Sequence, residues 1–599
     1  MLETYRRIFT LLSPRDRRIF VIVILLMLAA GAAEVVGVAA IIPLLAVVAE
    51  PAAVQREGIL GRAYRLGGFE DVNAFLGALC LVVFGVLLVS ITVRVASTYA
   101  TARFTRGVVL TLSQALLTQY LRNPYEWYLT RHTADLGKSL LSETKEVVNG
   151  SIRPAMQFIS DGIVAVTLIG FLIKLEPVGA LVTAGMVGAA FALIYWRLHR
   201  LLRSVGADRR RAVKERFQIT QEALGGIKEV KVLGLEEAYI KRFYGPSRRL
   251  ARHQATLQLV GELPRFALEA LGFGGMLLFL FVLLVSNEGQ LSVVLPILGA
   301  FALAGLRLLP TVQVLFRSSA QMRFHQPAIE ALFDELDADT GPGLGARDGP
   351  AVPLREALRL EGLTYRYPGA EADGLRGVNL TIPARSSFGF VGPTGAGKTT
   401  LIDVILGLLP PTEGRLSVDG VEVTHENRRA WQRSIGYVQQ SVHLVDDTIA
   451  ANIAFGEKPS GVHREDVEHA SRLANLHDFV VSLPEGYDTK IGERGVRLSG
   501  GQRQRIAIAR ALYRDPDVIV FDEATSALDT VTERAVMDAI ASLHGEKTLI
   551  VVTHRLSTVA ACDQVVVMRE GRIEAVGPYA ELAGRGGTFG ALLASADGG

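Results

Sequence analysis

Long apolar stretches alternate with charged segments through the first half of the chain. Each stretch approaches or exceeds the roughly 20 residues that a helix needs to cross the hydrocarbon core of a membrane. This pattern predicts an all-α membrane domain of six spanning helices. The expected spans run at about 20–48, 74–97, 154–174, 178–198, 267–286 and 291–315.

The connections between these spans differ in length and charge. Those after the second and fourth spans are long and rich in Arg, Lys, Glu and Gln, whereas those at 175–177 and 287–290 are very short. Arginines precede the first span and follow the fourth. Because positive charge near membrane ends marks the cytoplasmic side, both ends of the bundle and its long loops are expected in the cytoplasm.

Helix-breaking residues interrupt both long loops. Pro124 lies in the first loop, and the pair Gly225 and Gly226 lies in the second. Proline and paired glycines disfavour helix interiors, so the membrane helices are expected to continue into the cytoplasm and to reverse there. The reversals are either two short helices that dock on a neighbouring domain or plain turns.

The first external connection, residues 50–71, is amphipathic. Apolar side chains such as Ile59, Leu60 and Tyr64 alternate there with arginines. Such a segment is expected to form a short helix on the outer surface or on the bundle wall. The alternative is a solvated loop with scattered apolar residues.

Four charged residues lie within or beside the spans: Glu34, Arg94, Arg265 and Arg307. Charge inside a membrane is costly, so each needs a partner or a function. Snorkelling or an internal ion pair is one explanation. The other is a cavity in which the three arginines bind an anionic substrate group, because guanidinium pairs with phosphate oxygens through two hydrogen bonds.

The second half of the chain has a different pattern. A Pro/Gly/Asp run at 337–350 has no apolar period and is typical of a flexible linker. After it, short apolar strands alternate with helical stretches, which predicts an α/β domain around a mainly parallel sheet. The expected parts are a membrane domain at 1–320, a linker at 321–353 and an α/β domain at 354–599.

Composition agrees with this division. Of the 599 residues, 49% are hydrophobic, a share that fits membrane segments better than a soluble enzyme. The net charge of +3 is small, so bulk charge indicates no nucleic-acid partner. The two cysteines, Cys80 and Cys562, lie in different halves, which argues against a disulfide and fits a reducing compartment.

A glycine-rich turn stands between the predicted strand 388–391 and the predicted helix 401–409. Such a turn directs backbone N–H groups into one small space, and the helix N-terminus adds partial positive charge. Lys398 can reach the β- and γ-phosphates of ATP, and the Thr399 hydroxyl can bind Mg²⁺. The predicted ATP-binding loop comprises Gly392, Pro393, Thr394, Gly395, Ala396, Gly397, Lys398, Thr399 and Thr400.

Two carboxylates follow the buried apolar strand predicted at 517–521. Asp522 can hold the Mg²⁺ shell through water. Glu523 can polarise the attacking water as a general base. Two acids at the end of such a strand, in a chain that also has a phosphate loop, predict ATP hydrolysis.

Three more residues are candidates because of their positions. His554 follows the predicted strand 548–552 and can contact the γ-phosphate. Gln440 closes the predicted strand 435–438 and can bind Mg²⁺ or the attacking water. Tyr367 can stack on the adenine ring, unless it is only an aromatic residue in a turn.

A second glycine-led helix start occurs at Ser499, Gly500, Gly501 and Gln502. It makes another backbone anion site. One nucleotide bound to a single domain does not need two phosphate-binding helix ends. Both ends are used if two copies pair head-to-tail and each closes the other's ATP, so the sequence predicts a homodimer.

In this order, the motifs resemble those of the ATP-binding cassette transporters. The resemblance is carried by the phosphate loop, Gln440, Leu498-Ser-Gly-Gly-Gln502, Asp522-Glu523, Ser526-Ala-Leu-Asp529 and His554. With six preceding spans, the chain is similar to exporter half-transporters that work as homodimers. The resemblance implies an ATPase that uses ATP and Mg²⁺, and it implies that Glu493 contacts an intracellular loop of the partner.

Within that family, the chain is most similar to the bacterial flippases of lipid-linked oligosaccharides used in protein N-glycosylation. Glu34, the amphipathic external segment, Pro264-Arg-Phe-Ala-Leu-Glu269 and Leu306-Arg-Leu-Leu-Pro310 carry this likeness. It implies that Arg94, Arg265 and Arg307 engage the diphosphate between polyprenol and glycan. The expected function is ATP-driven flipping of that lipid across the bacterial inner membrane, with the nucleotide-binding domain in the cytoplasm.

Two alternatives stay open. The first is an exporter of another substrate, such as a lipid A precursor, a drug or a peptide. The second is a nucleotide-gated receptor or channel that regulates rather than pumps. Such proteins often lose the catalytic glutamate or a signature residue, and both motifs are complete in this sequence.

Overall fold

The computed structural model describes residues 9, 13–51, 54, 58–131, 136–137, 139–286, 291–336, 351–492, 495–523, 537, 541–585 and 587–597. Side chains are described within these ranges except at 183, 187, 190, 199, 263, 264, 268, 271–273, 276, 278, 279, 282–286, 291–296 and 595–597. The chain divides into two compact units. The first comprises Met1–Leu121 and His132–Asp339, and the second comprises Arg122–Arg131 and Thr340–Gly599.

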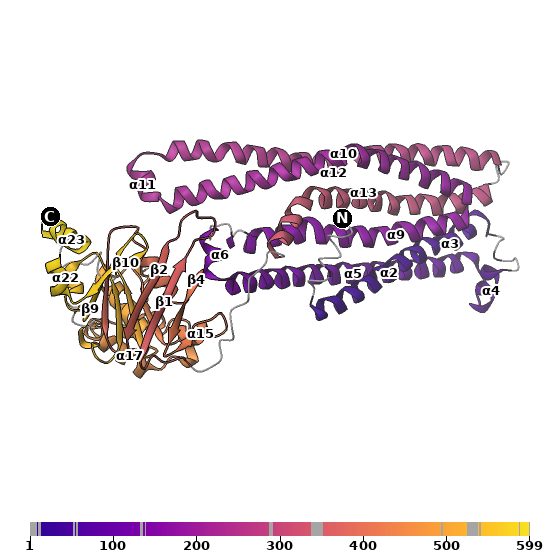
Figure 1. Ribbon diagram of the computed structural model, residues 1–599. Coiled ribbons are helices and arrows are strands. Elements are labelled where there is room, and N and C mark those ends of the chain that lie inside the picture. Colours follow the sequence, from indigo (N-terminus) through magenta and orange to yellow (C-terminus); the bar gives the residue numbers. More distant parts are fainter. Residues whose placement is uncertain are drawn as a thin grey trace. The chain divides into compact units, whose positions relative to one another are not determined.

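The described part of the first unit is helical, and several helices are very long (Figure 1). Helices α5 and α12 have 51 residues each, which at 1.5 Å per residue makes each about 76 Å long. About 20 residues suffice to cross a hydrocarbon core, so both helices extend well beyond a membrane. The helices are α2 (Pro14–Ala39), α3 (Ile41–Ala49), α4 (Ile59–Leu66), α5 (Val72–Arg122), α8 (Thr144–Val147), α9 (Arg153–Leu175), α10 (Pro177–Gly225), α11 (Ile227–Val232), α12 (Glu236–Ser286) and α13 (Leu291–Leu336), with π-helical turns at Ser139–Glu143 and Val148–Ile152.

Five helical segments among the described residues are long and apolar enough to cross a membrane. They coincide with or overlap five of the six expected spans. The remaining expected span, residues 267–286, lies in the second half of α12, where many side chains are outside the described residues. The five segments are Pro14–Ala49, Val72–Arg122, Ser139–Leu175, Pro177–Leu198 and Ile297–Leu336.

Helix α13 organises the first unit, because it packs against α9, α10 and α12. Small residues permit this packing. A Cβ atom on Gly206 of α10 would lie 2.0 Å from the carbonyl oxygen of Phe324 on α13, so the close approach of these helices requires glycine. Buried side chains of Leu202, Val260 and Phe316 complete the contact with α12.

The amphipathic external segment forms the short helix α4, as the first of the two interpretations predicted. Leu60 and Tyr64 pack against a cluster that contains buried Val47 and Phe75. Ile59 and Leu66 instead remain 89% and 88% exposed. The helix therefore leans on the bundle wall and presents apolar side chains outward.

The second unit contains two sheets. An antiparallel sheet has the strand order β2-β1-β4-β5, and a six-stranded sheet has the order β10-β9-β3-β8-β7-β6. The strands are β1 (Ala357–Tyr365), β2 (Leu375–Pro383), β3 (Ser387–Val391), β4 (Glu413–Val418), β5 (Val421–Glu422), β6 (Ile435–Val438), β7 (Val518–Asp522), β8 (Thr548–Val552), β9 (Gln564–Arg569) and β10 (Arg572–Gly577). The helices are α6 (Tyr125–Leu129), α14 (Lys398–Ile405), α15 (Arg428–Gln432), α16 (Ile449–Ile453), α17 (Arg464–Leu473), α18 (His477–Val481), α19 (Gly500–Leu512), α21 (Leu556–Val559), α22 (Tyr579–Arg585) and α23 (Gly587–Asp597), with 3₁₀ turns at Pro459–Gly461 and Gly486–Asp488.

Five neighbouring strands of the larger sheet, from β9 to β6, are parallel to one another. Residues along β3, β7 and β8 are almost all buried, which explains their continuous apolar sequences. One core lies around α14 and β1, and a second lies around α17 and α19. The carboxyl ends of the parallel strands therefore lie side by side along one edge.

The two helix-breaking sites of the long loops both form short helices. In the first loop, Pro124 caps α6, which belongs to the second unit. The Glu126 carboxylate of α6 accepts a hydrogen bond from the Tyr365 hydroxyl at 2.7 Å, which confirms the predicted docking for this loop. In the second loop, Gly226 precedes α11, which belongs to the first unit.

Candidate functional site

The glycine-rich loop connects buried β3 to α14. Gly392, Gly395 and Gly397 have φ values of 155°, 80° and 97°, which other residues rarely adopt. A Cβ atom on Gly392 would lie 2.3 Å from the carbonyl oxygen of Met568. The loop conformation thus depends on glycine at these positions. Pro393, Thr394 and Gly395 at its tip are exposed, and Ala396 is buried beneath them.

Lys398 is the first residue of α14, and its side chain turns back into the loop. Its Nζ donates hydrogen bonds to the carbonyl oxygens of Gly392 at 2.8 Å and Pro393 at 3.1 Å. Burial lowers the pKa of Lys398, and the nearby carboxylates of Glu523 and Asp522 oppose this shift. A buried ammonium beside exposed loop N–H groups is suited to bind polyphosphate.

Asp522 and Glu523 stand at the carboxyl end of β7. Burial raises the pKa of Asp522, and the adjacent Glu523 adds to that rise. The Tyr437 hydroxyl donates a hydrogen bond to Asp522 Oδ2 at 3.1 Å. Glu523 has a φ of 47°, a left-handed conformation that is costly for glutamate. Its N–H donates to the Val552 carbonyl oxygen at 2.8 Å, which ties this turn to β8.

Gln440 and His554 both contact Glu523. Gln440 Nε2 donates to Glu523 Oε2 at 2.6 Å, and His554 Nε2 lies 2.8 Å from Glu523 Oε1. Gln440 follows β6, Glu523 follows β7 and His554 follows β8, so the parallel strand order brings these three predicted residues together. The amide carbonyl of Gln440 is not used in its bond to Glu523 and can face a cation.

Tyr367 lies just beyond β1 and also joins the loop. Its hydroxyl is 3.0 Å from the Thr400 hydroxyl on α14. Thr399, the residue before Thr400, is exposed, whereas Thr400 is 7% exposed. The structure therefore positions the Tyr367 ring beside the phosphate loop.

The second glycine-led helix start lies at α19. Ser499 and Gln502 cap one another reciprocally: Gln502 N donates to Ser499 Oγ at 3.3 Å, and Ser499 N donates to Gln502 Oε1 at 2.8 Å. Gly500 is exposed and Gly501 is buried. Since α19 packs in a different core from α14, the two glycine-led helix ends belong to separate parts of the unit.

Comparisons with known proteins agree with this geometry. The ABC transporter family matches residues 375–526, and the ABC transporter transmembrane region matches residues 20–303. The chain is 31% identical to the ATP-dependent lipid A-core flippase of Cupriavidus metallidurans over 85% of each chain. The chain belongs to the ABC transporter family.

Other similar proteins carry the same description. The ATP-dependent lipid A-core flippase of Ralstonia nicotianae is 31% identical over 85% of each chain, and that of Alkalilimnicola ehrlichii is 30% identical over the same shares. Among solved structures, a bacterial Atm1-family ABC exporter with ATP bound has a TM-score of 0.79 at 24% identity. It covers 97% of this chain and 98% of its own, and it shows that the chain has the ABC exporter fold.

This ABC transporter is therefore an exporter half-transporter with a helical transmembrane domain followed by an ATP-binding domain. It is a multi-pass membrane ATPase, and its nucleotide-binding domain lies in the cytoplasm. Two elements of the family resemblance, Glu493 and Ser526-Ala-Leu-Asp529, lie outside the described residues.

The charged residues of the spans form two groups. Glu34 of α2 is buried, and its Oε1 lies 3.0 Å from Arg307 Nε of α13 and 3.8 Å from Arg94 Nη1 of α5. Ser90 Oγ donates to Glu34 Oε2 at 3.3 Å. Arg265 instead pairs with Glu269 of its own helix at 2.8 Å. The structure thus brings together two of the three predicted arginines, around an internal ion pair.

Two residues at the nucleotide site were missed by the sequence analysis. Asp403 is the one acidic residue of helix α14, and Tyr437 precedes buried Val438 on β6. Burial and the Asp522 carboxylate raise the pKa of Asp403 to about 6. A single carboxylate in an otherwise apolar run was the available signal for Asp403.

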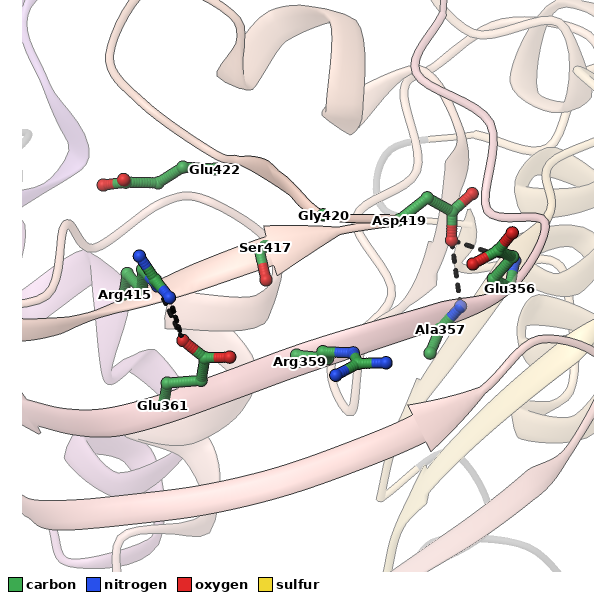
Figure 2. A pocket seen from close by; sticks show the side chains of 9 residues that line it. All are labelled: Glu356, Ala357, Arg359, Glu361, Arg415, Ser417, Asp419, Gly420 and Glu422. Atoms are coloured by element: carbon green, nitrogen blue, oxygen red, sulfur yellow. Dashed lines mark hydrogen bonds and ion pairs between the residues drawn. The ribbon is translucent and has the colours of Figure 1, made fainter.

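A hollow of about 370 Å³ lies on the antiparallel sheet, away from these residues (Figure 2). Arg415 Nε donates to Glu361 at 2.6 Å, and the Asp419 carboxylate accepts from the N–H groups of Arg355, Glu356 and Ala357. These contacts stabilise the sheet edge. We therefore assign the nucleotide site to the phosphate loop and not to this hollow.

The raised pKa of Asp403 predicts a pH-dependent gain in stability for Asp403→Asn. A carboxyl whose folded pKa exceeds its unfolded value of 3.8 destabilises the fold increasingly as pH rises from 3.8, and this penalty is complete above about 6. After allowance for partial solvent exposure, we expect a gain of about 1 kcal/mol at pH 7.5. The measurement is the thermal midpoint of the nucleotide-free protein at pH 7.5 and pH 5.0.

The gain at pH 5.0 should be about half as large, because pH 5.0 lies between the unfolded and folded pKa values and only part of the penalty has developed there. Asp446, an exposed aspartate of the same unit, provides the matched control Asp446→Asn. Equal gains at both pH values would show that lost packing or polarity, and not ionisation, determines the effect.

Proposed function

We propose that this exporter is an ATP-driven flippase of a phosphate-bearing glycolipid in the bacterial inner membrane. One observation carries the proposal: Arg94 and Arg307, from different helices, converge on buried Glu34. Guanidinium binds phosphate oxygens through paired, charge-assisted hydrogen bonds. A phosphate that arrives between these arginines can take over the contacts that Glu34 makes.

Accessibility supports an anion site at this cluster. The side chains of Arg94 and Arg307 are 52% and 37% exposed, whereas that of Glu34 is 6% exposed. The guanidinium groups are thus reachable while their counter-ion lies behind them. The Asp161 carboxylate of α9 also acts electrostatically on Arg94, so an incoming anion would compete with Glu34 and Asp161 for the arginines.

The similar proteins favour one substrate class. Those from Cupriavidus metallidurans and Ralstonia nicotianae are described as lipid A-core flippases. We therefore favour a lipid A-like substrate over the polyprenyl-diphosphate glycan that the sequence analysis expected. The latter stays as the second candidate, because it presents the same phosphate oxygens to Arg94 and Arg307. Drugs and peptides lack this group as a class.

The apolar part of the substrate has a candidate surface at α4. Ile59 and Leu66 are exposed there, while Leu60 and Tyr64 anchor the helix on the bundle. A polar glycan and its phosphates cannot cross hydrocarbon unaided. We infer that the arginine cluster shields the headgroup while acyl or polyprenyl chains stay against apolar surfaces such as α4.

In this proposal the exporter works as a homodimer, and ATP drives its transport cycle. Ser499, Gly500, Gly501 and Gln502 of one copy close on ATP bound by Lys398 and the loop of the other. The location of α14 and α19 in separate cores supports this pairing, because one chain then has two half-sites. Hydrolysis with Glu523 as general base, aided by Gln440 and His554, resets the exporter.

The residues around Asp522 fit Mg²⁺. Asp522 and Glu523 are adjacent carboxylates, and Asp522 is partly buried, a combination that a divalent cation would relieve. The Thr399 hydroxyl, the Gln440 carbonyl and, through water, Asp522 would hold the ion. When bound, Mg²⁺ neutralises part of the phosphate charge.

Replacement of Glu523 by Gln should abolish ATP turnover and retain ATP binding. Gln has the same size as Glu and can still form hydrogen bonds beside Gln440 and His554, but it cannot accept a proton. We expect a loss of about 10²-fold or more in kcat, measured as phosphate release, with the Kd for ATP within about twofold. A nucleotide-gated channel would keep its ATP response in this variant, whereas a pump would stop.

Arg94→Ala and Arg307→Ala should each slow ATP-dependent flipping about tenfold or more, since a charge-assisted hydrogen bond contributes about 1.5–3 kcal/mol. Basal ATP hydrolysis should stay within about twofold. Arg265→Ala should cause a smaller loss, because Arg265 pairs with Glu269. Arg103→Ala is the matched control, since Arg103 is exposed on the opposite face of α5. Unchanged flipping in all three test variants would contradict the substrate site.

A substrate panel in proteoliposomes decides between the two lipid classes. The panel contains labelled lipid A-core, its dephosphorylated form, a polyprenyl-diphosphate glycan and a neutral phospholipid. We expect ATP-dependent flipping of lipid A-core and its loss on dephosphorylation. Flipping of the polyprenyl-diphosphate glycan alone would select the second candidate. Equal flipping of the dephosphorylated lipid would refute a phosphate-reading cavity.

A further inference from the structure

Helix α6 contacts the nucleotide-binding domain through one fully buried hydroxyl. Tyr365, the last residue of β1, is 1% exposed, and its hydroxyl donates to Glu126 Oε1 at 2.7 Å. Burial raises the pKa of Tyr365, and the Glu126 carboxylate adds to the rise. The hydroxyl therefore stays protonated and remains a donor.

The same tyrosine touches the residue that we place at the adenine. The ring of Tyr365 meets the ring of Tyr367 edge-on, with centroids 5.1 Å apart. The Tyr367 hydroxyl in turn lies 3.0 Å from the Thr400 hydroxyl at the phosphate loop. Three successive contacts thus connect Glu126 of α6 to the first turn of α14.

A second residue of α6 lies in the same region. Tyr125 is close enough to Asp403 of α14 and to Tyr367 for both to raise its pKa, after burial as the main cause. The Glu126 carboxylate acts electrostatically on Arg428 of α15, whose guanidinium is largely buried. Helix α6 is therefore seated beside the nucleotide site and not on a remote surface of the domain.

Core packing alone does not explain the hydroxyl of Tyr365, because a phenylalanine ring would fill the same core volume. A buried hydroxyl without a partner is destabilising, because it has lost its hydrogen bonds to water and makes none in the protein. Movement of Glu126 away from Tyr365 leaves this hydroxyl unpaired, so the position of α6 and the packing of the two tyrosine rings are energetically linked.

We propose that Tyr365 and Glu126 are a positioning pair that reports adenine contact at Tyr367 to helix α6. The inference rests on the proposed role of Tyr367 at the base. Base stacking fixes the Tyr367 ring, its edge contact fixes Tyr365, and the hydroxyl fixes Glu126. Because α6 directly follows α5 in sequence, nucleotide occupancy then affects the C-terminal end of the membrane-spanning helix α5.

The test follows Trp127, which lies on α6 next to Glu126. The chain has three tryptophans, so 5-fluorotryptophan labelling gives three ¹⁹F resonances, and Trp127→Phe assigns the one from α6. All proteins carry Glu523→Gln to prevent turnover. Inorganic tripolyphosphate, which fills the phosphate loop but has no base, is compared with ATP.

We expect ATP to shift the Trp127 resonance and tripolyphosphate to leave it in place. In Tyr365→Phe, the Kd for ATP should change less than about twofold while the Trp127 shift is lost. Glu126→Gln, which keeps an acceptor of the same size, should retain a reduced shift. A Trp127 shift of wild-type size in Tyr365→Phe, or an equal shift with tripolyphosphate, would overturn the proposal.

Two controls separate the possible failures. Tyr367→Ala should weaken ATP binding, and unchanged affinity would remove the premise that Tyr367 contacts the base. No transported lipid is present, so the outcome is independent of the flippase assignment. A Tyr365→Phe protein whose thermal midpoint and ATP affinity match the parent excludes misfolding as the cause of a lost shift.

Discussion

The nucleotide site depends on the strand order β3-β8-β7-β6 in the parallel sheet. Neighbouring strands lie about 4.8 Å apart, so loops that leave their carboxyl ends are adjacent although they are distant in sequence. Lys398, Gln440, Glu523 and His554 meet for this reason. Gly389 in β3 is part of the same constraint, because a Cβ there would lie 2.6 Å from Val559 Cγ1 and would displace α21 from the sheet.

Charged groups at both proposed sites are held by internal partners. Lys398 contacts carbonyl oxygens of its own loop, and Glu523 is held between Gln440 and His554. In the membrane bundle, Glu34 is the internal ion-pair partner of Arg94 and Arg307. An anionic ligand must exchange with these partners, so binding costs less reorganisation than ordering a free side chain would. The exchange also provides the differential contacts that a conformational change requires.

The sequence predicted the features that local backbone chemistry determines. Strands β6 and β8 have the expected bounds, and the phosphate loop has its glycines at positive φ. Helix α14 begins at Lys398, before the expected 401, and ends at Ile405, before the expected 409, because Leu406 caps it and Gly407 adopts a φ of 65°. Long apolar stretches marked most membrane spans but not the register between helices, so the pairing of Glu34 with Arg94 and Arg307 could not be decided.

Contacts between distant segments could not be predicted either. Tyr365 and Glu126 are 239 positions apart, and each alone is unremarkable in sequence. Asp403 is an acidic residue in a largely apolar helical run, but its neighbours Asp522 and Tyr125 come from other elements and were not apparent in the sequence. Such groups are defined by what surrounds them after folding, because burial and nearby charge determine their chemistry.

The energy of one buried hydrogen bond suits the link that we propose at α6. Leaving the Tyr365 hydroxyl unpaired costs about 1–3 kcal/mol, and coupling free energies between sites are typically about 1–3 kcal/mol. A contact of this size biases the position of α6 without locking it. A charged pair in a dry interior would hold the helix more rigidly and resist the repeated movement that a transport cycle needs. The hydrogen bond from the Tyr365 hydroxyl to the Glu126 carboxylate, together with the edge contact between Tyr365 and Tyr367, therefore suits a connection that must form and break repeatedly.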